Sequence, residues 1–256
     1  MAKVPSFDLK GQVAIVSGAS RGIGESIAHA LAANGAHVIC TSRKAESVAG
    51  VAESIRANGG SAEALSCHIG DLEAIDKLYE TVAAKHDRLD ILVNNAAANP
   101  YFGPIQDTDT GAFQKTVDVN IRGYFFMSAR AVKLMQKRNY GAIVNLTSIN
   151  AFVPGAFQGI YSITKAAILS MTQAYAKEVA PLGIRVNALA PGATDTKFAS
   201  TLVNTPSISE KILERTPLGR FAQPDEMAGA ALYLVSPAAS YTTGTCITVD
   251  GGVLIG

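Results

Sequence analysis

The stretch VAIVSGASRGIGESIAHALAA, residues 13–33, decides the fold of this chain. It begins with an apolar run ending at Ser17, which is too short for a helix and uniformly apolar, as in a strand buried on both faces. A turn with Gly18, Gly22 and Gly24 follows, and then a segment of helical composition. A strand, a glycine turn and a helix in this order bring backbone N–H groups and a helix N-terminus against a pyrophosphate. A tight turn without a ligand is the alternative explanation of the glycines.

The residues at the end of the next strand, 37–41, bear on the choice of cofactor. An NAD site needs a carboxylate here to accept from the ribose 2′-hydroxyl, whereas an NADP site needs a cation and small hydroxyls around the 2′-phosphate. The chain has Ser42, Arg43 and Lys44 at this point and no acid directly after the strand. With Arg21 in the glycine turn, this pattern favours NADP(H), with NAD(H) as the alternative. The predicted nucleotide contacts in these two segments are Gly18, Ser20, Arg21, Gly22, Ile23, Gly24, Ser42 and Arg43.

The alternation of short apolar strands with helical segments continues along the chain. Such alternation indicates βαβ units, a parallel sheet and helices on both of its faces. We therefore expect an α/β protein: a single-domain Rossmann fold over residues 1–256, with a doubly wound parallel seven-stranded sheet. The expected strands are 13–17, 37–41, 62–66, 89–93, 142–146, 184–189 and 246–249. The expected helices are 25–33, 45–57, 72–85, 110–137, 159–179, 207–215 and 225–234.

Composition and charge exclude several classes of protein. The 256 residues are 48% hydrophobic and 17% charged with a net charge of +1, so the chain can bury a large core but has no basic surface for nucleic acid or anionic membrane. Residues 1–5 lack the apolar stretch of a signal peptide and no apolar run is long enough to span a membrane, so we expect a cytoplasmic protein. The isolated cysteines and histidines predict neither disulfides nor a metal site. They are Cys40, Cys67, Cys246, His29, His37, His68 and His86.

A second informative stretch carries Ser148 at a strand end and then Tyr161 and Lys165 in a predicted helix. Residues four apart lie on one helix face, so the two side chains should be neighbours. A phenol with its usual pKa of about 10 is a poor base at neutral pH, and a nearby ammonium favours the phenolate and makes the group usable in both directions. Ser148 is then suited to hydrogen-bond a carbonyl oxygen that the phenol protonates. A Tyr–Lys pair at this spacing is also common on solvated helix faces.

Polar residues recur where other predicted strands end. Asn94-Asn95-Ala96 follows one strand and Pro191-Gly192-Ala193-Thr194 another, at the carboxyl edge where parallel sheets bind ligands, although asparagines are also ordinary turn residues. Asn120 lies between apolar neighbours, so we expect a buried amide with hydrogen-bond partners and a kink in its helix. Residues 195–222 hold one short helical segment among turn residues, and we expect them to form a mobile lid over the site.

Together these motifs resemble, in order and spacing, those of the short-chain dehydrogenase/reductase family over almost the whole chain. The residues that carry the resemblance are Gly18, Gly22, Gly24, Asn94, Asn95, Ala96, Asn120, Ser148, Tyr161, Lys165, Pro191 and Gly192. The resemblance implies an NAD(P)-dependent oxidoreductase that interconverts a ketone and a secondary alcohol by hydride transfer. It also implies a homotetramer that pairs segments 110–137 and 159–179 and the final strand between subunits.

The resemblance also implies a role for each site residue. Tyr161 exchanges a proton with the substrate oxygen, while Lys165 lowers the pKa of Tyr161 and holds the nicotinamide ribose. Ser148 orients the carbonyl, and Asn120 anchors a water in the proton relay. Thr194 binds near the nicotinamide carboxamide. Further cofactor contacts are expected at His68, Ile69, Asn95, Ala96, Pro191 and Gly192, and at Tyr161 itself.

Two positions depart from the pattern of the family. Ala97 stands where a glycine is usual. His68 and Ile69 stand where an aspartate commonly meets the adenine amino group, which leaves the adenine contact open.

The substrate is less well defined than the chemistry. Loop residues expected near the nicotinamide are mostly apolar or aromatic, and they include Tyr101, Phe102, Ile149, Asn150, Phe152, Phe157 and Phe198. They favour an apolar or aromatic ketone, or a 3-oxoacyl thioester whose polar carrier stays outside, so carbonyl reductase and 3-oxoacyl reductase remain equal alternatives. A role in packing the lid explains the phenylalanines equally well. A non-catalytic nucleotide-sensing protein of the same fold would be expected to lack Tyr161 or Lys165, and both are present.

Overall fold

The computed structural model describes residues 4–256. Residues 1–3, part of the segment expected to lack a signal peptide, lie outside the described residues. The described chain forms one parallel seven-stranded sheet, whose strands are β1 Val13–Ser17, β2 His37–Ser42, β3 Ser61–Ser66, β4 Ile91–Asn94, β5 Gly141–Leu146, β6 Ile184–Pro191 and β7 Cys246–Val249. Their order is β3-β2-β1-β4-β5-β6-β7, so the winding reverses between β1 and β4, where doubly wound folds bind their ligands.

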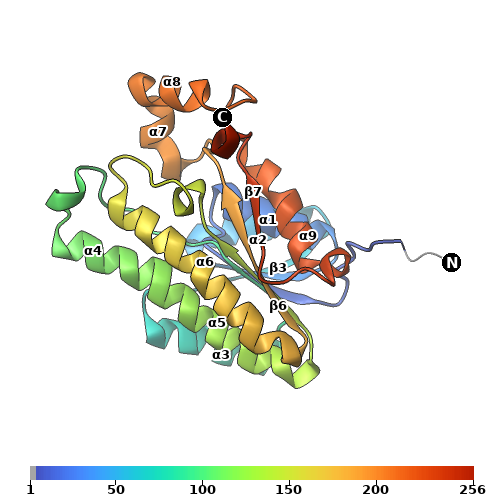
Figure 1. Ribbon diagram of the computed structural model, residues 1–256. Coiled ribbons are helices and arrows are strands. Elements are labelled where there is room, and N and C mark those ends of the chain that lie inside the picture. Colours follow the sequence, from blue (N-terminus) through green and yellow to red (C-terminus); the bar gives the residue numbers. More distant parts are fainter. Residues whose placement is uncertain (1–3) are drawn as a thin grey trace.

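Helices cover both faces of this sheet (Figure 1). The α-helices are α1 Gly22–Ala33, α2 Glu46–Ala57, α3 Leu72–His86, α4 Thr110–Val117, α5 Tyr124–Met135, α6 Gly159–Val179, α7 Ser200–Asn204, α8 Pro206–Glu214 and α9 Ala228–Val235. Neighbouring residues of β1 point to opposite faces: Ala14 and Val16 pack under α1, α2 and α9, and Val13 and Ile15 under α3, α5 and α6. The predicted fold class is therefore confirmed.

The predicted helix 110–137 is interrupted. A π-helical turn, η2 Asp118–Gly123, separates α4 from α5, which confirms the kink expected around Asn120. A Cβ on Gly123 would lie 2.5 Å from the carbonyl oxygen of Ile69, so only a glycine lets this turn approach the end of the neighbouring strand so closely.

The segment 195–222 contains more helix than expected. A 3₁₀ turn, η6 Lys197–Ala199, leads into α7, and Pro206 then starts α8, so the prediction of a single helical segment is wrong. Pro206 explains the break, because proline is tolerated in the first turn of a helix and not in its interior. Figure 1 shows α7 and α8 standing apart from the two helical layers, near the C-terminus. Neither helix contains a buried residue.

No helix within residues 4–256 combines the length and the apolar character needed to cross a membrane.

Candidate active site

Tyr161 and Lys165 lie on one buried face of α6, as predicted. The exposed fractions are 8% for Tyr161 and 2% for Lys165, and the Lys165 Nζ is 5.4 Å from the centre of the Tyr161 ring. Lys165 Nζ also donates a 2.8 Å hydrogen bond to the carbonyl of Leu146, at the carboxyl end of β5, and lies 5.5 Å from the centre of the Tyr124 ring. Among the described residues no carboxylate pairs with this ammonium. The helix thus directs a phenol and a cation together to the carboxyl edge of the sheet.

Burial dominates the electrostatics of this pair. Removal from water raises the pKa of Tyr161 well above its usual value, and the nearby Ser148 hydroxyl lowers it in part. Burial also lowers the pKa of Lys165 to about 7. Removal from water penalises the charged form of both groups, and the lowering of the phenol pKa by Lys165 stays a prediction.

Ser148 lies between the end of β5 and the start of α6. Its backbone is extended, and its Oγ accepts a 3.1 Å hydrogen bond from the N–H of Asn150. The Oγ1 of the preceding Thr147 donates a 2.7 Å hydrogen bond to the carbonyl of Lys165, which fixes the strand end against α6. The hydroxyl proton of Ser148 remains available for a second oxygen.

Asn120 is fully buried at the π-helical turn, as predicted for an amide between apolar neighbours. Its Oδ1 accepts from the N–H of Ala98 at 2.8 Å, and its Nδ2 donates to the Ala98 carbonyl and to Thr164 Oγ1, each at 3.0 Å. Thr164 in turn donates to the carbonyl of Tyr161 at 2.8 Å. Both amide protons are thus used to join the loop after β4 to the helix that carries Tyr161. Sequence reasoning predicted the burial of Asn120 and missed these partners.

The glycine turn is held by the segment that follows β4. Asn95 Nδ2 donates to the carbonyls of Ser17 and Gly18, at 2.8 and 3.1 Å, and Ser17 Oγ accepts from the N–H groups of Asn95 and Ala96. A Cβ on Gly18, whose φ is +67°, would lie 2.8 Å from the Ala96 Cα. The side-chain amide of Asn95, predicted as a cofactor contact, therefore hydrogen-bonds the protein backbone. Gly18 is needed because the glycine turn and the segment after β4 lie too close together for a Cβ. Ser20 and Ile23 lie half-buried in the same turn.

Two arginines lie at the ends of the adjacent strands β1 and β2. The side chains of Arg21 and Arg43 are exposed and have no hydrogen-bond or ion-pair partner within residues 4–256. Ser42 Oγ donates to the carbonyl of Lys44 at 2.7 Å, which shapes the turn that presents Arg43. Helix α1 begins between these cations without a side-chain cap on its first N–H groups.

His68 and Ile69 follow β3 beside the same strand end. The N–H of Cys67 donates to the carbonyl of Ser42 at 2.7 Å, so this loop lies against the end of β2. His68 Nδ1 accepts from the N–H of Gly70 at 3.0 Å, which leaves Nε2 as the free nitrogen of the ring. The side chain of Ile69 is buried in the core, so it offers only its backbone to a ligand.

The residues after β6 are tightly packed. Pro191 ends the strand, and a Cβ on Gly192 would lie 2.6 Å from the Asp250 Cα. Thr194 is buried, and its Oγ1 donates to the carbonyl of Gly192 at 3.1 Å.

The two ends of the segment 195–222 meet at this point. The N–H of Asp195 donates to the carbonyl of Ala222 at 2.8 Å, and the N–H of Ala222 donates to the carbonyl of Ala193 at 3.0 Å. At its start the segment also crosses the glycine turn, since a Cβ on Gly22 would lie 3.1 Å from Thr196 Cγ2. The segment is therefore a closed loop whose two ends are hydrogen-bonded together beside the glycine turn.

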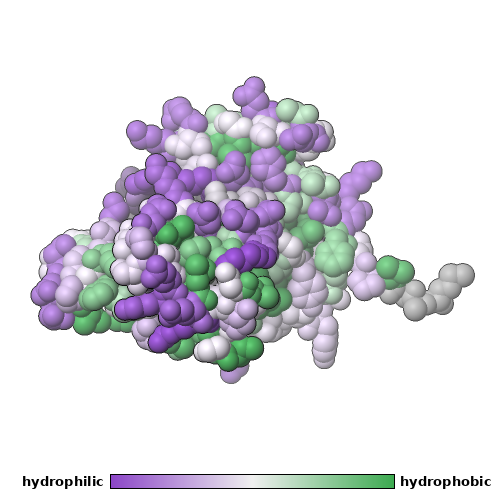
Figure 2. All heavy atoms as spheres, turned by 90° about the horizontal axis from the view of Figure 1, so that it is seen from above, coloured by the Kyte–Doolittle hydropathy of each residue, from purple (hydrophilic) through white to green (hydrophobic). Residues whose placement is uncertain are grey.

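Tyr161 has an aromatic neighbour, and two further phenylalanines contact each other in nearby loops. The Phe198 ring, at the start of the same loop, lies 5.9 Å from the Tyr161 ring between centres, and Phe102 lies 5.9 Å from Phe157. Figure 2, which views the molecule from above, shows apolar groups between hydrophilic ones on this face. Exposed apolar side chains of these loops are Phe102, Phe152, Val153, Phe157 and Phe198.

Amide side chains form a second, polar group among these loops. Gln158 Oε1 accepts from Asn150 Nδ2 at 3.3 Å and from Asn99 Nδ2 at 3.5 Å. The Asn99 Oδ1 is buried and has no partner within the described chain. Sequence reasoning named Asn150 and missed Asn99 and Gln158, because nothing in the local pattern shows that the loops after β4 and β5 meet.

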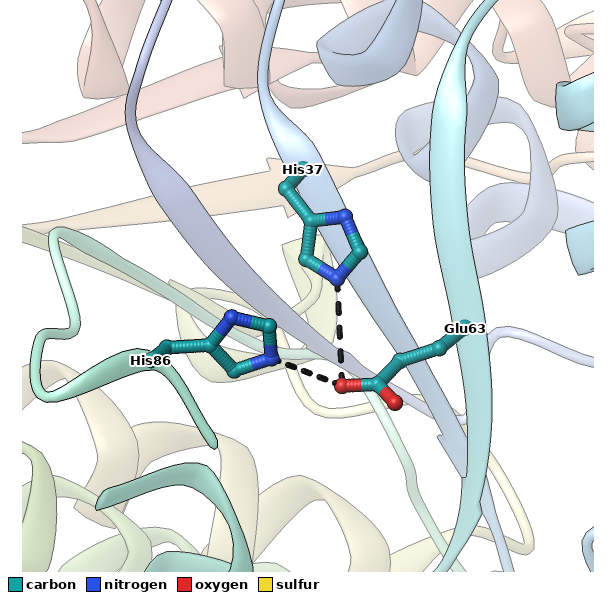
Figure 3. A group of neighbouring side chains, drawn as sticks. All are labelled: His37, Glu63 and His86. Atoms are coloured by element: carbon teal, nitrogen blue, oxygen red, sulfur yellow. Dashed lines mark hydrogen bonds and ion pairs between the residues drawn. The ribbon is translucent and has the colours of Figure 1, made fainter. Parts of the chain in front are cut away.

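Two of the histidines come close together in the fold. His37 and His86 lie on either side of the Glu63 carboxylate (Figure 3).

Most of the chain matches known proteins. A family model described as enoyl-(acyl carrier protein) reductase matches residues 18–254. Dehydrogenase/reductase SDR family member 4 of Homo sapiens is 38% identical over 244 residues, which are 95% of this chain and 88% of that protein. A 3-oxoacyl-(acyl-carrier-protein) reductase of Synechocystis is 38% identical over 254 residues, which are 96% of this chain and 98% of that protein.

Solved structures agree with these matches. A gluconate 5-dehydrogenase from Burkholderia cenocepacia in complex with NADP and tartrate is 30% identical, with a TM-score of 0.95 and 98% of each chain covered. A short-chain type dehydrogenase/reductase from Mycobacterium marinum is 32% identical, with a TM-score of 0.91 and 98% of each chain covered.

Proposed function

Because the chain belongs to the short-chain dehydrogenase/reductase family of NAD(P)-dependent oxidoreductases, we propose that it interconverts a ketone and a secondary alcohol with Tyr161 as the acid/base. The observation that carries the proposal is that half-buried Ser148 stands with buried Tyr161 and Lys165 at the carboxyl edge of the sheet. A phenol and a hydroxyl directed at one point suit a carbonyl oxygen, which accepts from both.

In the reducing direction Ser148 orients the carbonyl and Tyr161 donates its proton to the carbonyl oxygen. The bound nicotinamide supplies the hydride to the carbonyl carbon. The high pKa of Tyr161 keeps the phenol protonated at neutral pH, which suits this direction. Once the proton has left, the protonated form of Lys165 stabilises the phenolate until a proton returns. In the oxidising direction Tyr161 takes the alcohol proton, and Lys165 assists by favouring the phenolate.

The residues present fit NADP(H). The first N–H groups of α1 lack a side-chain cap, and such groups bind phosphate oxygens. Arg21 and Arg43 are exposed cations without partners in the described chain, and a 2′-phosphate would supply the missing anion. The NADP complex of the gluconate 5-dehydrogenase relative supports this choice, and NAD(H) is the alternative. We assign the nicotinamide end to Lys165, Pro191, Gly192 and Thr194, and the remaining contacts to the turn and to His68, Ile69, Asn95 and Ala96.

We assign Asn120 a positioning role and, through a water, a place in the proton relay. Since both of its amide protons are used by Ala98 and Thr164, such a water would be held by the backbone of the π-helical turn. Such turns are frequent at functional sites.

For the substrate we propose an apolar or aromatic ketone. The aromatic side chains of Phe102, Phe157 and Phe198 support this choice. A 3-oxoacyl thioester is the second candidate, favoured by the 38% identity to a 3-oxoacyl reductase.

We also propose that the chain acts as a single domain, with residues 195–222 as a substrate lid. Because α7 and α8 bury no residue, little holds them to the body of the protein, as a lid requires. A cytoplasmic homotetramer is proposed as well. Exposed Phe113, Phe125 and Ile163 on α4, α5 and α6 support burial of these helices between subunits.

The proposal is tested by replacing Tyr161 with phenylalanine and following NADPH absorbance with a panel of ketones and alcohols. Loss of the acid/base should lower kcat by about 10²–10⁴-fold. The dissociation constant of NADPH, measured by fluorescence, should stay within about threefold of wild type, since the aromatic ring remains and only the hydroxyl is lost. Tyr175→Phe is the matched control, because Tyr175 lies on the same helix but donates to the Phe125 carbonyl away from the site. Equal turnover of Tyr161→Phe and wild type would remove the mechanism.

A further inference from the structure

Three side chains with metal-binding atoms meet at the amino edge of the sheet, away from the proposed active site. They are His37 at the start of β2, Glu63 in β3 and His86 at the end of α3, and their ligand atoms all lie within 4.8 Å of one another (Figure 3). His86 Nε2 is 2.8 Å from Glu63 Oε1, and His37 Nε2 is 3.8 Å from the same oxygen. All three side chains are partly buried, with exposed fractions of 20–27%.

The fold explains why these residues meet. His37 pairs with Ser61 in the parallel register of β2 and β3, so Glu63, two residues along, points to the same face of the sheet. That face is covered by α3, whose last residue is His86. Three separate elements therefore hold the cluster, and no short sequence motif encodes it.

One of the two ring nitrogens of His37 has no hydrogen-bond partner within the described chain. Its Nδ1 is 2.7 Å from Ser61 Oγ, while its Nε2 is buried and has no hydrogen-bond partner within the described chain. Glu63 Oε1, at 3.8 Å from Nε2, is too far for a hydrogen bond. If Ser61 accepts from Nδ1, the Nε2 lone pair faces a carboxylate, and a cation between the two acceptors would satisfy both.

We propose that His37, Glu63 and His86 bind a divalent transition-metal ion, with Zn²⁺ as the probe. Two imidazoles and one carboxylate are a donor set that zinc accepts, and with bonds of about 2.0–2.1 Å two donors of a tetrahedral ion lie about 3.3 Å apart. The two distances to Glu63 Oε1 lie on either side of this value. The hydrogen bond between Ser61 Oγ and His37 Nδ1 orients the imidazole ring so that Nε2 faces the ion. Binding replaces the proton between His86 and Glu63, and water completes the coordination.

The charges around the cluster leave the ligands available. Burial, followed by the nearby His86, lowers the pKa of His37, so its imidazole is neutral at neutral pH. Burial disfavours the charged form of Glu63, but hydrogen bonds from Lys85 and His86 outweigh this and lower the pKa of Glu63, which is therefore ionised. Lys85 Nζ contacts Glu63 Oε2 at 2.6 Å, and because its side chain is half exposed it can turn towards solvent. The ammonium should weaken metal binding without preventing it.

The site would join β2, β3 and α3 without contacting Tyr161. An ion that binds only the folded chain stabilises it, so Zn²⁺ should raise the melting temperature. We therefore infer a structural role for the metal.

The experiment is a calorimetric titration of the full-length protein with ZnCl₂, paired with melting temperatures with and without zinc. Wild type should bind one ion, with a melting temperature raised by a few degrees. His37→Ala, His86→Ala and Glu63→Gln should each weaken zinc binding at least tenfold and abolish the thermal shift. His29→Ala, on α1, is the matched control and should bind as wild type does. All these variants keep the three cysteines, so binding by thiols would not distinguish them.

Lys85→Met keeps every proposed ligand and removes a competing charge, so it should bind zinc more tightly than wild type by about three- to tenfold. This variant also tests the proposal if a variant that lacks a ligand fails to fold. Equal zinc affinity in wild type and His37→Ala, no thermal shift in wild type, or weaker binding by Lys85→Met would each overturn the proposal. With Co²⁺ as the probe, a visible absorption band typical of tetrahedral coordination should appear in wild type and be absent from His37→Ala.

Discussion

The ammonium of Lys165 lies 5.4 Å from the centre of the Tyr161 ring, and it donates its hydrogen bond to the carbonyl of Leu146. Both side chains are buried, and removal from water disfavours the phenolate of Tyr161 and the ammonium of Lys165. With a pKa of about 7, Lys165 is divided between its charged and neutral forms near neutral pH. The burial that places Lys165 beside the phenol therefore also makes its charged form unfavourable.

We expect Lys165→Met to be more stable than wild type at neutral pH. An unfolded lysine has a pKa of about 10.4, so between that pH and about 7 the unfolded chain binds more protons than the folded one, and falling pH destabilises the fold. At pH 7 this cost is about 4 kcal/mol, and the carbonyl of Leu146 left unpaired by methionine offsets about 1–3 kcal/mol of the gain. The variant should therefore be more stable by about 2 kcal/mol in urea denaturation.

Relative to wild type, Lys165→Met should lose about 3 kcal/mol of stability between pH 7 and pH 9.5, because the cost of keeping Lys165 unprotonated in the folded chain falls from about 4 to about 1 kcal/mol. The variant should therefore become less stable than wild type, by about 1 kcal/mol, at pH 9.5. Lys177→Met is the control, since Lys177 is exposed on the same helix. A pH-independent difference between Lys165→Met and wild type would contradict the lowered pKa.

Arg43→Ala should separate the two cofactors. A hydrogen bond to a charged group contributes about 1.5–3 kcal/mol, so loss of the guanidinium should raise the KM for NADPH by about 10–100-fold. The KM for NADH, which lacks the 2′-phosphate, should change less than about twofold. Arg138→Ala, another exposed arginine far along the chain, is the control for a general charge effect. If both cofactors lose affinity equally, the 2′-phosphate is not held by Arg43.

The strands were predictable because parallel strands buried on both faces are short apolar runs, and the burial of β1 and β5 is complete. The main error concerned β4, predicted from residue 89 and observed from Ile91. Asp90 explains it: its carboxylate accepts from the N–H of Val13 at 2.8 Å and pairs with Arg88, so this residue fixes the strand entrance through its side chain.

The site was predictable in its residues and not in its contacts. Asn120 was recognised as a buried amide, but its partners Ala98 and Thr164 lie 22 and 44 residues away, and only the fold brings them together. The same holds for His37 and Glu63, whose neighbourhood depends on strand register. The low pKa of Lys165 follows from its burial. The spacing of Tyr161 and Lys165 predicts that they share a helix face, but not that this face is buried.

Gly24→Ala should destabilise the protein and weaken NADPH binding. A Cβ at this position would meet the Asn95 side chain and the Gly18 carbonyl, so the segment after β4 would have to move away from the glycine turn. Overpacking of this kind costs about 1–3 kcal/mol. Gly50→Ala in α2 is the control, because its Cβ would meet nothing within 4 Å and should stabilise the helix by about 0.5–1 kcal/mol. Urea denaturation should therefore show a lower free energy of unfolding for Gly24→Ala and a higher one for Gly50→Ala. Changes in the same direction would contradict this prediction.

The Asn120 amide should be coupled energetically to Thr164. Asn120→Ala leaves the N–H and C=O of Ala98 without their partners, and we expect it to lower the free energy of unfolding by about 2–4 kcal/mol. In a double-mutant cycle with Thr164→Val, the double variant should lose about 0.5–1.5 kcal/mol less than the sum of the losses of the two single variants. The reason is that each single substitution already removes the hydrogen bond between the two side chains. Asn58→Ala, which breaks an exposed amide hydrogen bond to the Ser54 carbonyl, is the control and should cost about 0.5 kcal/mol or less. Additive losses, or an Asn120→Ala cost no larger than that of Asn58→Ala, would show that the amide does not join the π-helical turn to the Tyr161 helix.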